Sequence, residues 1–180
     1  MSLRRQLSRL IGLEDKVAHL ESGALAPNFT LKTRAGVQHK LSTLLEKGPV
    51  VVAFFKISCP VCQFTMPFLE RMHERFAGRS ASIIGLSQDS AKDTGEFCDD
   101  YSLRFPVLLD DSGYPVSNAY GLTNVPTIFL IEPDGKIKIE CMGFDKAALE
   151  KITAELELQT KLPPQPLFRP GEIVPAYKPG

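Results

Sequence analysis

The hydrophobic residues of this chain fall into short uniform runs that alternate with segments of helical spacing. Residues 49–55 are all apolar and rich in valine and phenylalanine, and such a run predicts a buried strand at 50–56. From Phe64 to Phe76 the apolar residues recur at helical intervals, which predicts an amphipathic helix over about residues 60–77. The chain therefore turns a corner, from a buried strand into a helix, just before residue 60.

The same alternation of strands and helices continues along the chain. We expect a short hairpin around residues 34–36, strands at 81–87, 105–109, 127–131 and 137–141, and helical segments at about 90–101, 114–119 and 145–158. The sequence Pro133-Asp134-Gly135 predicts a turn that joins the last two strands into an antiparallel hairpin. Such an order is typical of an α/β fold, with a central mixed sheet flanked by helices.

The two ends of the chain differ from this central region. Residues 1–23 carry leucine and isoleucine at the spacing of an amphipathic helix that would end at Ser22-Gly23, with three arginines on its polar face. Docking of this helix on the domain or on a second subunit is favoured over binding to a membrane surface. Residues 159–180 are expected to form a proline-rich tail, because six prolines within residues 161–180 exclude a helix there and predict an extended path. The central domain is expected over residues 24–158.

Length and charge exclude several classes of function. A chain of 180 residues suits one globular domain with appendages. Lys+Arg and Asp+Glu are equal at 21 each, so no excess of charge indicates a nucleic-acid partner. No apolar run is long enough to predict a membrane span. The first residues lack the apolar core of a signal peptide, which favours the cytoplasm, or the periplasm or secretion if a leader has been removed. Nothing in the sequence indicates the oligomeric state.

The candidate chemistry lies at the corner between the buried strand and the helix. Cys59 and Cys62 stand there in the motif Cys59-Pro60-Val61-Cys62, with Cys59 at the mouth of the predicted helix. Unpaired backbone N–H groups and the helix dipole favour an anion at that place, and the thiolate anion is the reactive form of cysteine. The motif therefore predicts a redox-active dithiol.

The other two cysteines are expected to have a structural role. Cys98 and Cys141 stand alone in the sequence, and isolated cysteines are usually small buried hydrophobic residues. A role for Cys98 as a second resolving thiol stays open as an alternative. A metal site is not predicted, because the chain has no second CxxC and no Cys/His pair at metal-ligand spacing.

Several segments around the dithiol resemble those of a known family, in the same order. They are Ala26–Leu31, Ile84–Asp89, Phe105–Asp110, Ala119–Leu122, Val125–Ile131 and Asp134–Ile137. With them, the chain resembles the thioredoxin-like superfamily over about residues 24–158, and within it the AhpC/TSA and TlpA/ResA-like redoxins. The resemblance implies a thioredoxin-like fold, a redox-active centre with a reversible disulfide bond, and no cofactor.

This resemblance also implies roles for individual residues. Cys59 would be the nucleophile, and Cys62 would be the resolving thiol that attacks the mixed disulfide and frees the partner. Val125 and Pro126 would form the cis-proline loop, which lies against the dithiol and offers backbone groups to the substrate. The residues that are candidates for tuning the dithiol are Lys56, Pro60, Val61 and Gln63.

The chain departs from its relatives at places where they carry helper residues. It has no tryptophan, so the Trp that often precedes the first cysteine is replaced by Ser58. Ala53 occupies the place of the buried Asp of thioredoxins, and Thr65 that of a Glu found in some TlpA/ResA-like proteins. We therefore assign no general base.

Three functions are compatible with these features. The first is a thiol–disulfide oxidoreductase that acts on protein or small-molecule disulfides and dithiols with an external thiol reductant; a cytoplasmic location would favour reduction. The second is a peroxiredoxin-type peroxidase with antioxidant activity towards hydroperoxides. Peroxiredoxins resemble a pattern with Thr or Ser three residues before the reactive cysteine. In this chain Lys56 stands three residues before Cys59, and Cys59 stands three residues before Cys62, so neither cysteine fits that pattern. The third is a redox-switched binding module that uses the basic N-terminal segment or the proline-rich tail.

Overall fold

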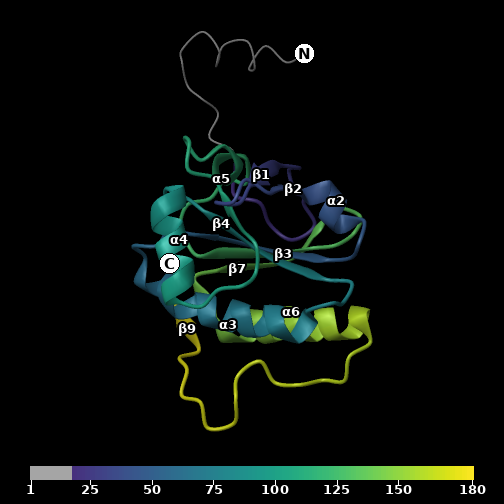
Figure 1. Ribbon diagram of the computed structural model, residues 1–180. Helices are drawn as coiled ribbons and strands as arrows, with labels where there is room; N and C mark the ends of the chain where they lie inside the picture. Colours follow the sequence, from purple (N-terminus) through teal and green to yellow (C-terminus); the bar gives the residue numbers. More distant parts are fainter. Residues whose placement is uncertain (1–17) are drawn as a thin grey trace.

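A computed structural model describes residues 18–180, and its centre is a five-stranded mixed sheet (Figure 1). The strands are β3 (Val50–Phe55), β4 (Ser82–Ser87), β5 (Val107–Leu109), β6 (Thr127–Ile131) and β7 (Ile137–Met142). Their order in the sheet is β5-β4-β3-β6-β7. Strands β3, β4 and β5 run parallel, whereas β6 is antiparallel to β3 and β7 is antiparallel to β6. The predicted α/β fold with a mixed sheet is confirmed.

Helices and a hairpin cover the two faces of this sheet. Helices α3 (Pro60–Phe76) and α6 (Lys146–Thr160) lie together on one face, and α4 (Ala91–Asp100) contributes Phe97 to the same layer (Figure 1). The opposite face carries α2 (Leu41–Leu45), α5 (Pro115–Ala119) and the hairpin of β1 (Thr30–Lys32) and β2 (Gln38–Lys40). The three long helices start and end within two residues of their predicted positions, whereas the short α2 was not predicted.

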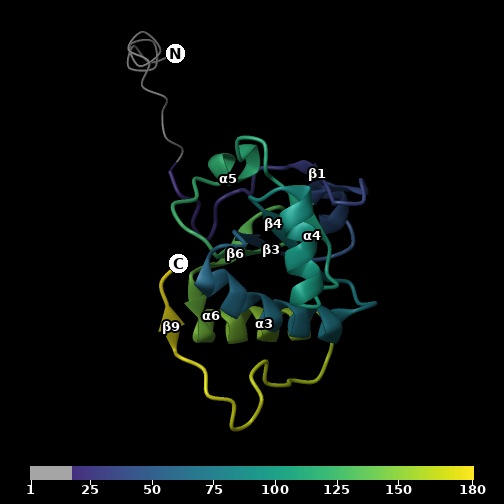
Figure 2. The ribbon, with the colours of Figure 1, turned by 60° about the vertical axis from the view of Figure 1, so that its left-hand side comes forward.

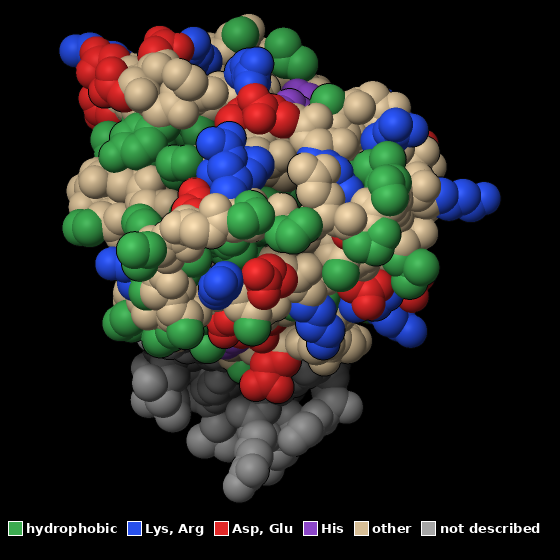
Figure 3. All heavy atoms as spheres, turned by 90° about the horizontal axis from the view of Figure 1, so that it is seen from below, with side chains coloured by type: hydrophobic (Ala, Val, Ile, Leu, Met, Phe, Trp, Pro, Cys, Tyr) green, Lys and Arg blue, Asp and Glu red, His purple; other side chains and the backbone are tan. Residues whose placement is uncertain are grey.

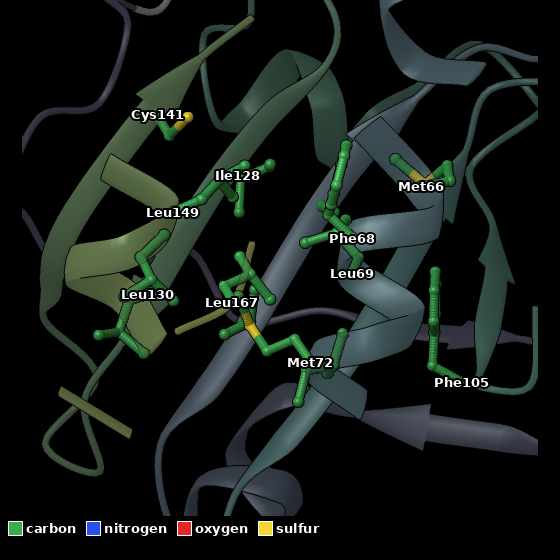
Figure 4. Close-up of a cluster of buried hydrophobic side chains, with 14 of the residues drawn as sticks. Met66, Phe68, Leu69, Met72, Phe105, Ile128, Leu130, Cys141, Leu149 and Leu167 are labelled. Atoms are coloured by element: carbon green, nitrogen blue, oxygen red, sulfur yellow. The ribbon is translucent and has the colours of Figure 1, made fainter. Parts of the chain in front are cut away.

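Strand β3 supplies side chains to both layers, which explains its continuous hydrophobic run. Residues 51, 53 and 55 belong to the cluster beneath α3 and α6, and residues 50, 52 and 54 to the cluster on the other face. All six have 0% exposure. A strand that is paired on both edges and covered on both faces has no solvent side, so every position is apolar. Figure 4 shows the α3/α6 layer, in which Met72, Leu130 and Leu149 lie around Leu167 from the C-terminal region.

The N-terminal helix predicted over residues 1–23 falls largely outside the described residues, and over residues 1–17 it stays a prediction. Residues 1–17 lie outside the part that the structure describes, and residues 18–23 form no helix. The backbone N–H of Leu20 donates to the carbonyl oxygen of Tyr120 (3.2 Å), and that of Gly23 to the carbonyl oxygen of Ile137 (2.8 Å). The Ser22 hydroxyl donates to the carbonyl oxygen of Lys138 (2.8 Å). These bonds tie the segment to β7 at the edge of the sheet and to the end of α5, and the chain turns at residues 22–23, which corrects the predicted helix over residues 18–23.

Residues 161–180, which we call the strap, contain no helix and are packed on the domain. Helix α6 runs to Thr160, so the strap begins two residues after the predicted start of the tail at residue 159. The strap crosses beneath α3 and α6 and returns towards the start of α3 (Figures 1 and 2). Leu167 and Phe168 are buried, with 3% and 5% exposure. Its last part forms β9 (Tyr177–Lys178), which pairs antiparallel with β8 (Phe144–Asp145). Figure 3, which looks at the molecule from the strap side, shows hydrophobic side chains interspersed with charged ones.

No helix within residues 18–180 is both long and apolar enough to cross a membrane.

Candidate active site

Cys59 stands between the end of β3 and the first turn of α3. It is the N-cap residue of α3, and Pro60 follows it at the first helical position, where a missing N–H does no harm. The half-buried Cys59 sulfur accepts a hydrogen bond from the backbone N–H of Cys62, at 3.3 Å. The same thiol donates to the carbonyl oxygen of Val125, at 3.4 Å. The structure therefore places Cys59 at the mouth of a helix, in contact with a second loop.

Cys62 lies one turn further along α3 and is fully buried, at 0% exposure. Burial raises the pKa of its thiol well above the ordinary value, and the neighbouring Cys59 and the Asp89 carboxylate add to this rise. The backbone N–H of Lys56 acts in the opposite direction. Both cysteines are free thiols in this structure. A reagent from solvent can reach Cys59, whereas Cys62 is reached through Cys59.

The loop that faces Cys59 contains a cis peptide bond between Val125 and Pro126. Hydrogen bonds hold this loop in place on both sides. The carbonyl oxygen of Pro126 accepts from the backbone N–H of Gly143, at 2.8 Å. The hydroxyl of Thr127 donates to the carbonyl oxygen of Asn124, also at 2.8 Å. The structure thus brings the carbonyl group of Val125, far from Cys59 in sequence, into contact with the Cys59 sulfur, and Pro126 directly follows it.

The tuning candidates occupy different positions around the dithiol. The ammonium nitrogen of Lys56 lies 5.3 Å from the centre of the Tyr114 ring. The side chain of Gln63 donates to the carbonyl oxygen of Ile57 (2.8 Å) and thereby fixes the loop before Cys59. Pro60 is exposed, and Val61 is half-buried against the core.

The two positions where relatives carry an acid hold no acid here. Ala53 is fully buried under α3, and the hydroxyl of the buried Thr65 donates to the carbonyl oxygen of Val61, at 2.6 Å. Asp89, two residues after the end of β4, was not singled out as a site residue from the sequence. Its carboxylate accepts from the backbone N–H of Ile57 at 2.8 Å and lies within electrostatic reach of Cys62. The order of the strands could have indicated Asp89. Neighbouring parallel strands have their carboxyl ends at the same edge of the sheet, so the residues after β4 lie near those after β3.

A polar hollow adjoins the dithiol on the side of α5. Its volume is about 260 Å³, and it is lined by Lys56, Gln88, Tyr114, Ser117, Asn118, Leu122, Thr123, Asn124 and Val125. Tyr114 has a left-handed backbone conformation (φ 55°), which is unusual for an aromatic residue. Lys56 is the charged residue of this lining, and it forms no ion pair with any carboxylate in residues 18–180.

The end of the strap reaches the other side of the cis-proline loop. A methyl group added at Gly180 would lie 2.5 Å from the carbonyl oxygen of Val125 and 2.9 Å from the side-chain nitrogen of Asn124. A methyl group added at Gly143 would collide with the backbone of Lys178. Residues 178–180 therefore pass between Gly143 and Val125, directly beside the carbonyl group that Cys59 contacts. This neighbourhood was not predicted from the sequence.

The remaining cysteines do not join the dithiol. Burial raises the pKa of the Cys98 thiol to about 11, against the opposing effect of Arg34. Burial also raises the pKa of Cys141 to about 12, and its thiol donates to the carbonyl oxygen of Gly143 (3.6 Å). Within residues 18–180 no group of three or more His, Cys, Asp or Glu residues is arranged to hold a metal ion.

Comparisons with known proteins identify the family. The AhpC/TSA family matches residues 22–139. Thiol-disulfide oxidoreductase ResA of Bacillus cereus (strain ATCC 10987 / NRS 248) is 32% identical over 133 residues, which cover 73% of this chain and 76% of that protein. A crystal structure named after the thiol:disulfide interchange protein DsbE, from Chlorobium tepidum, has a TM-score of 0.69 and 26% identity, over 77% of this chain and 97% of its own. Peroxidoxin BcpB from Mycobacterium tuberculosis has a TM-score of 0.67 and 26% identity, over 78% and 98%. The chain belongs to the AhpC/TSA family of the thioredoxin-like superfamily and is an oxidoreductase.

Proposed function

We propose that the protein is a thiol–disulfide oxidoreductase in which Cys59 is the nucleophile and Cys62 the resolving thiol. The observation that carries this proposal is the unequal setting of the two sulfurs. The half-buried sulfur of Cys59 accepts the Cys62 N–H at the helix mouth, and Cys62 is fully buried one turn behind it. The similarity of the chain to the thiol-disulfide oxidoreductase ResA of Bacillus cereus, over 73% of the chain, supports the same activity.

The reaction proceeds in two exchanges. The thiolate of Cys59 attacks one sulfur of a client disulfide, which forms a mixed disulfide and releases the other client sulfur as a thiolate. The thiolate of Cys62 then attacks the Cys59 sulfur, forms the Cys59–Cys62 disulfide and releases the second client thiolate. Two electrons pass from the protein to the client, and an external dithiol returns them in the reverse sequence of exchanges.

The first exchange prepares the second through charge. A negative Cys59 sulfur raises the pKa of Cys62, both by its charge and by its hydrogen bond. When Cys59 is bonded to the client, its sulfur is neutral and this cause disappears. The backbone N–H of Lys56 then favours the Cys62 thiolate, against burial and the charge of Asp89. Cys62 therefore becomes easier to deprotonate at the stage at which it must attack.

The two alternative functions are less well supported. A peroxidase needs donors that orient a hydroperoxide at the reactive sulfur, but the side chain three residues before Cys59 is Lys56, which lies over Tyr114. The binding module would use the proline-rich tail, which is packed against α3 and α6 through Leu167 and Phe168. Protein disulfides are therefore the proposed substrates.

The comparisons do not support the cytoplasmic location that the sequence favoured. We propose the alternative, a location in the periplasm or outside the cell, where an oxidoreductase of this type acts on proteins that form disulfides. Fractionation of the source cells with an antibody to the protein tests this, and recovery with cytoplasmic marker proteins contradicts it.

The proposed roles are tested by trapping the mixed disulfide. We expect the Cys62→Ser protein to accumulate a covalent complex with a disulfide-bonded client such as insulin, visible on a non-reducing gel and lost with dithiothreitol. Cys59→Ser should give no complex and no insulin reduction, and Cys98→Ser, the matched control, should retain full activity. A complex formed by Cys59→Ser but not by Cys62→Ser would reverse the two roles. The absence of disulfide reduction by the wild-type protein would refute the function.

A further inference from the structure

The last residues of the strap occupy space beside Cys59 and the cis-proline loop. Residues 178–180 pass between Gly143 and the Val125 carbonyl group, which also accepts the hydrogen bond of the Cys59 thiol. Gly143 in turn donates to Pro126 of the cis-proline loop, at 2.8 Å. The space beside the reactive sulfur on this side is therefore lined by two backbone segments and occupied by a third.

The occupying segment is bound as a strand. Lys178 pairs with Phe144 and Tyr177 with Asp145 in antiparallel register, and the N–H of Lys146 donates to the carbonyl oxygen of Ala176 (3.0 Å). The ammonium nitrogen of Lys178 lies 5.1 Å from the centre of the Phe64 ring, on the first turns of α3. This is the way in which an extended peptide adds itself to the edge of a sheet.

The strap is held firmly at its base and lightly at its end. Leu167 and Phe168 are buried, and Arg71 makes two hydrogen bonds to the Glu172 carboxylate, at 2.9 and 3.1 Å. Beyond Glu172 the side chain of Ile173 is fully exposed (99%), and Val174 is only partly buried against the core. The last residues are held by the two pairs of β9 and by the bond from Lys146 to Ala176. A two-stranded contact of this length is marginal by itself. The end can therefore leave the groove while the base stays docked.

We propose that residues 177–180 are an internal ligand of the client-binding groove, and that an extended client polypeptide binds beside Cys59 by displacing them. The inference rests on the proposed oxidoreductase function. The groove would accept an extended strand that pairs with β8, places a cation over Phe64 and has glycine or another very small residue next to Val125. These are the features by which Tyr177-Lys178-Pro179-Gly180 occupies it.

Residues 177–180 can compete with a client although their contacts are few, because the strap links them covalently to the domain. A short linker gives an attached segment an effective concentration on the order of millimolar. If the groove is free for about a tenth of the time, the apparent affinity for a client falls about tenfold. A small disulfide reagent, which needs only the Cys59 sulfur, is not subject to this competition.

The test compares three proteins with two substrates. We expect a protein that ends at Ala176 to have a kcat/KM about tenfold above wild type for a disulfide-bonded peptide and within twofold of wild type for the small reagent dithiobis(nitrobenzoic acid). Gly180→Val, whose side chain would meet the Val125 carbonyl group, should shift the peptide value in the same direction without shortening the chain. Ile173→Ser is the matched control within the strap and should equal wild type. The peptide Ala-Tyr-Lys-Pro-Gly, added at millimolar concentration, should inhibit the shortened protein.

The outcomes separate this inference from the proposed function. Equal kcat/KM values of the wild-type, shortened and Gly180→Val proteins for the peptide would overturn the internal ligand and leave the oxidoreductase intact. Loss of reduction of every disulfide in all proteins would refute the function instead. Amide hydrogen exchange gives a readout that needs no activity: we expect the amide of Phe144, the residue that pairs with Lys178, to exchange faster in the shortened protein, and unchanged protection of this amide would overturn the inference.

Discussion

Replacing Phe168 by alanine tests whether the strap is an integral part of the fold. The Phe168 side chain is 5% exposed and lies against two aromatic rings, with centroid distances of 4.9 Å to Phe68 and 6.0 Å to Phe144. The ammonium nitrogen of Lys146 lies 5.4 Å from the same ring. Phe68 and Phe144 both belong to the core cluster beneath the sheet. Phe168 is therefore the point at which the strap joins the core.

The size of the effect follows from these contacts. Burying a phenylalanine side chain contributes about 2 kcal/mol by transfer, and aromatic pairs add about 1 kcal/mol. We therefore expect Phe168→Ala to lower the free energy of unfolding by about 3 kcal/mol, at the lower end of the range for phenylalanine truncation in a core. For a chain of this size that corresponds to a fall in Tm of roughly 6–12 °C.

Urea denaturation followed by circular dichroism measures this change. Leu158→Ala is the matched control, since Leu158 is 74% exposed on α6, and its effect should stay within about 0.5 kcal/mol. A Phe168→Ala protein with the urea midpoint of the wild type would show that Phe168 adds nothing to the core. The strap would then have no fixed base, and the reasoning that leads from it to the groove beside Cys59 would fail.

Three further predictions concern titration and buried polar groups. Arg71 lowers the pKa of Glu172 from an ordinary 4.5 to about 2, so this pair stabilises the fold above about pH 4.5 and loses its effect as the pH falls towards 2; Glu172→Gln should flatten this part of the pH–stability curve, and an unchanged curve would contradict the pairing. Burial raises the pKa of Cys98 to about 11 and that of Cys62 even further, so iodoacetamide at pH 8 should label Cys59 first. Mass spectrometry of peptides measures the labelling, and equal labelling of Cys62 would contradict its burial. The buried Glu70 carboxylate accepts the backbone N–H groups of Arg104 (2.7 Å) and Phe105 (3.3 Å), so Glu70→Ala should cost about 2–4 kcal/mol in urea denaturation, and a neutral result would refute that role.

The long periodic segments could be read from the sequence because their local pattern coincides with their final environment. Residues 50–55 are apolar at every position because both faces of β3 are covered, and α3 shows helical spacing because one side of it is buried. The five-residue α2 and the two-residue β8 and β9 are too short for any period to appear.

The site was only partly predictable for a different reason. Cys59 and Cys62 are neighbours in the sequence, so their motif is visible there, and Val125 and Pro126 came from the resemblance to a family. The place of Asp89 depends on the pairing of β3 with β4, and that of Gly180 beside Val125 depends on the docking of Phe168 on the core and on the pairing of β9 with β8. Contacts of this kind result from packing between distant segments. The prolines of the strap indicate its extended shape but not the surface on which it lies.

The absence of an acid beneath Cys62 has a consequence for the order of events. Neither the methyl group of Ala53 nor the hydroxyl of Thr65, which donates to Val61, can accept the Cys62 proton. Activation of Cys62 then depends on neutralising the Cys59 sulfur, because burial and the Asp89 charge persist throughout the cycle. The rate at which the mixed disulfide is resolved should therefore follow the fraction of Cys62 that is thiolate, and it should rise with pH. A client that remains covalently attached in this interval also keeps residues 177–180 out of the groove, so the internal ligand returns only when Cys62 has acted.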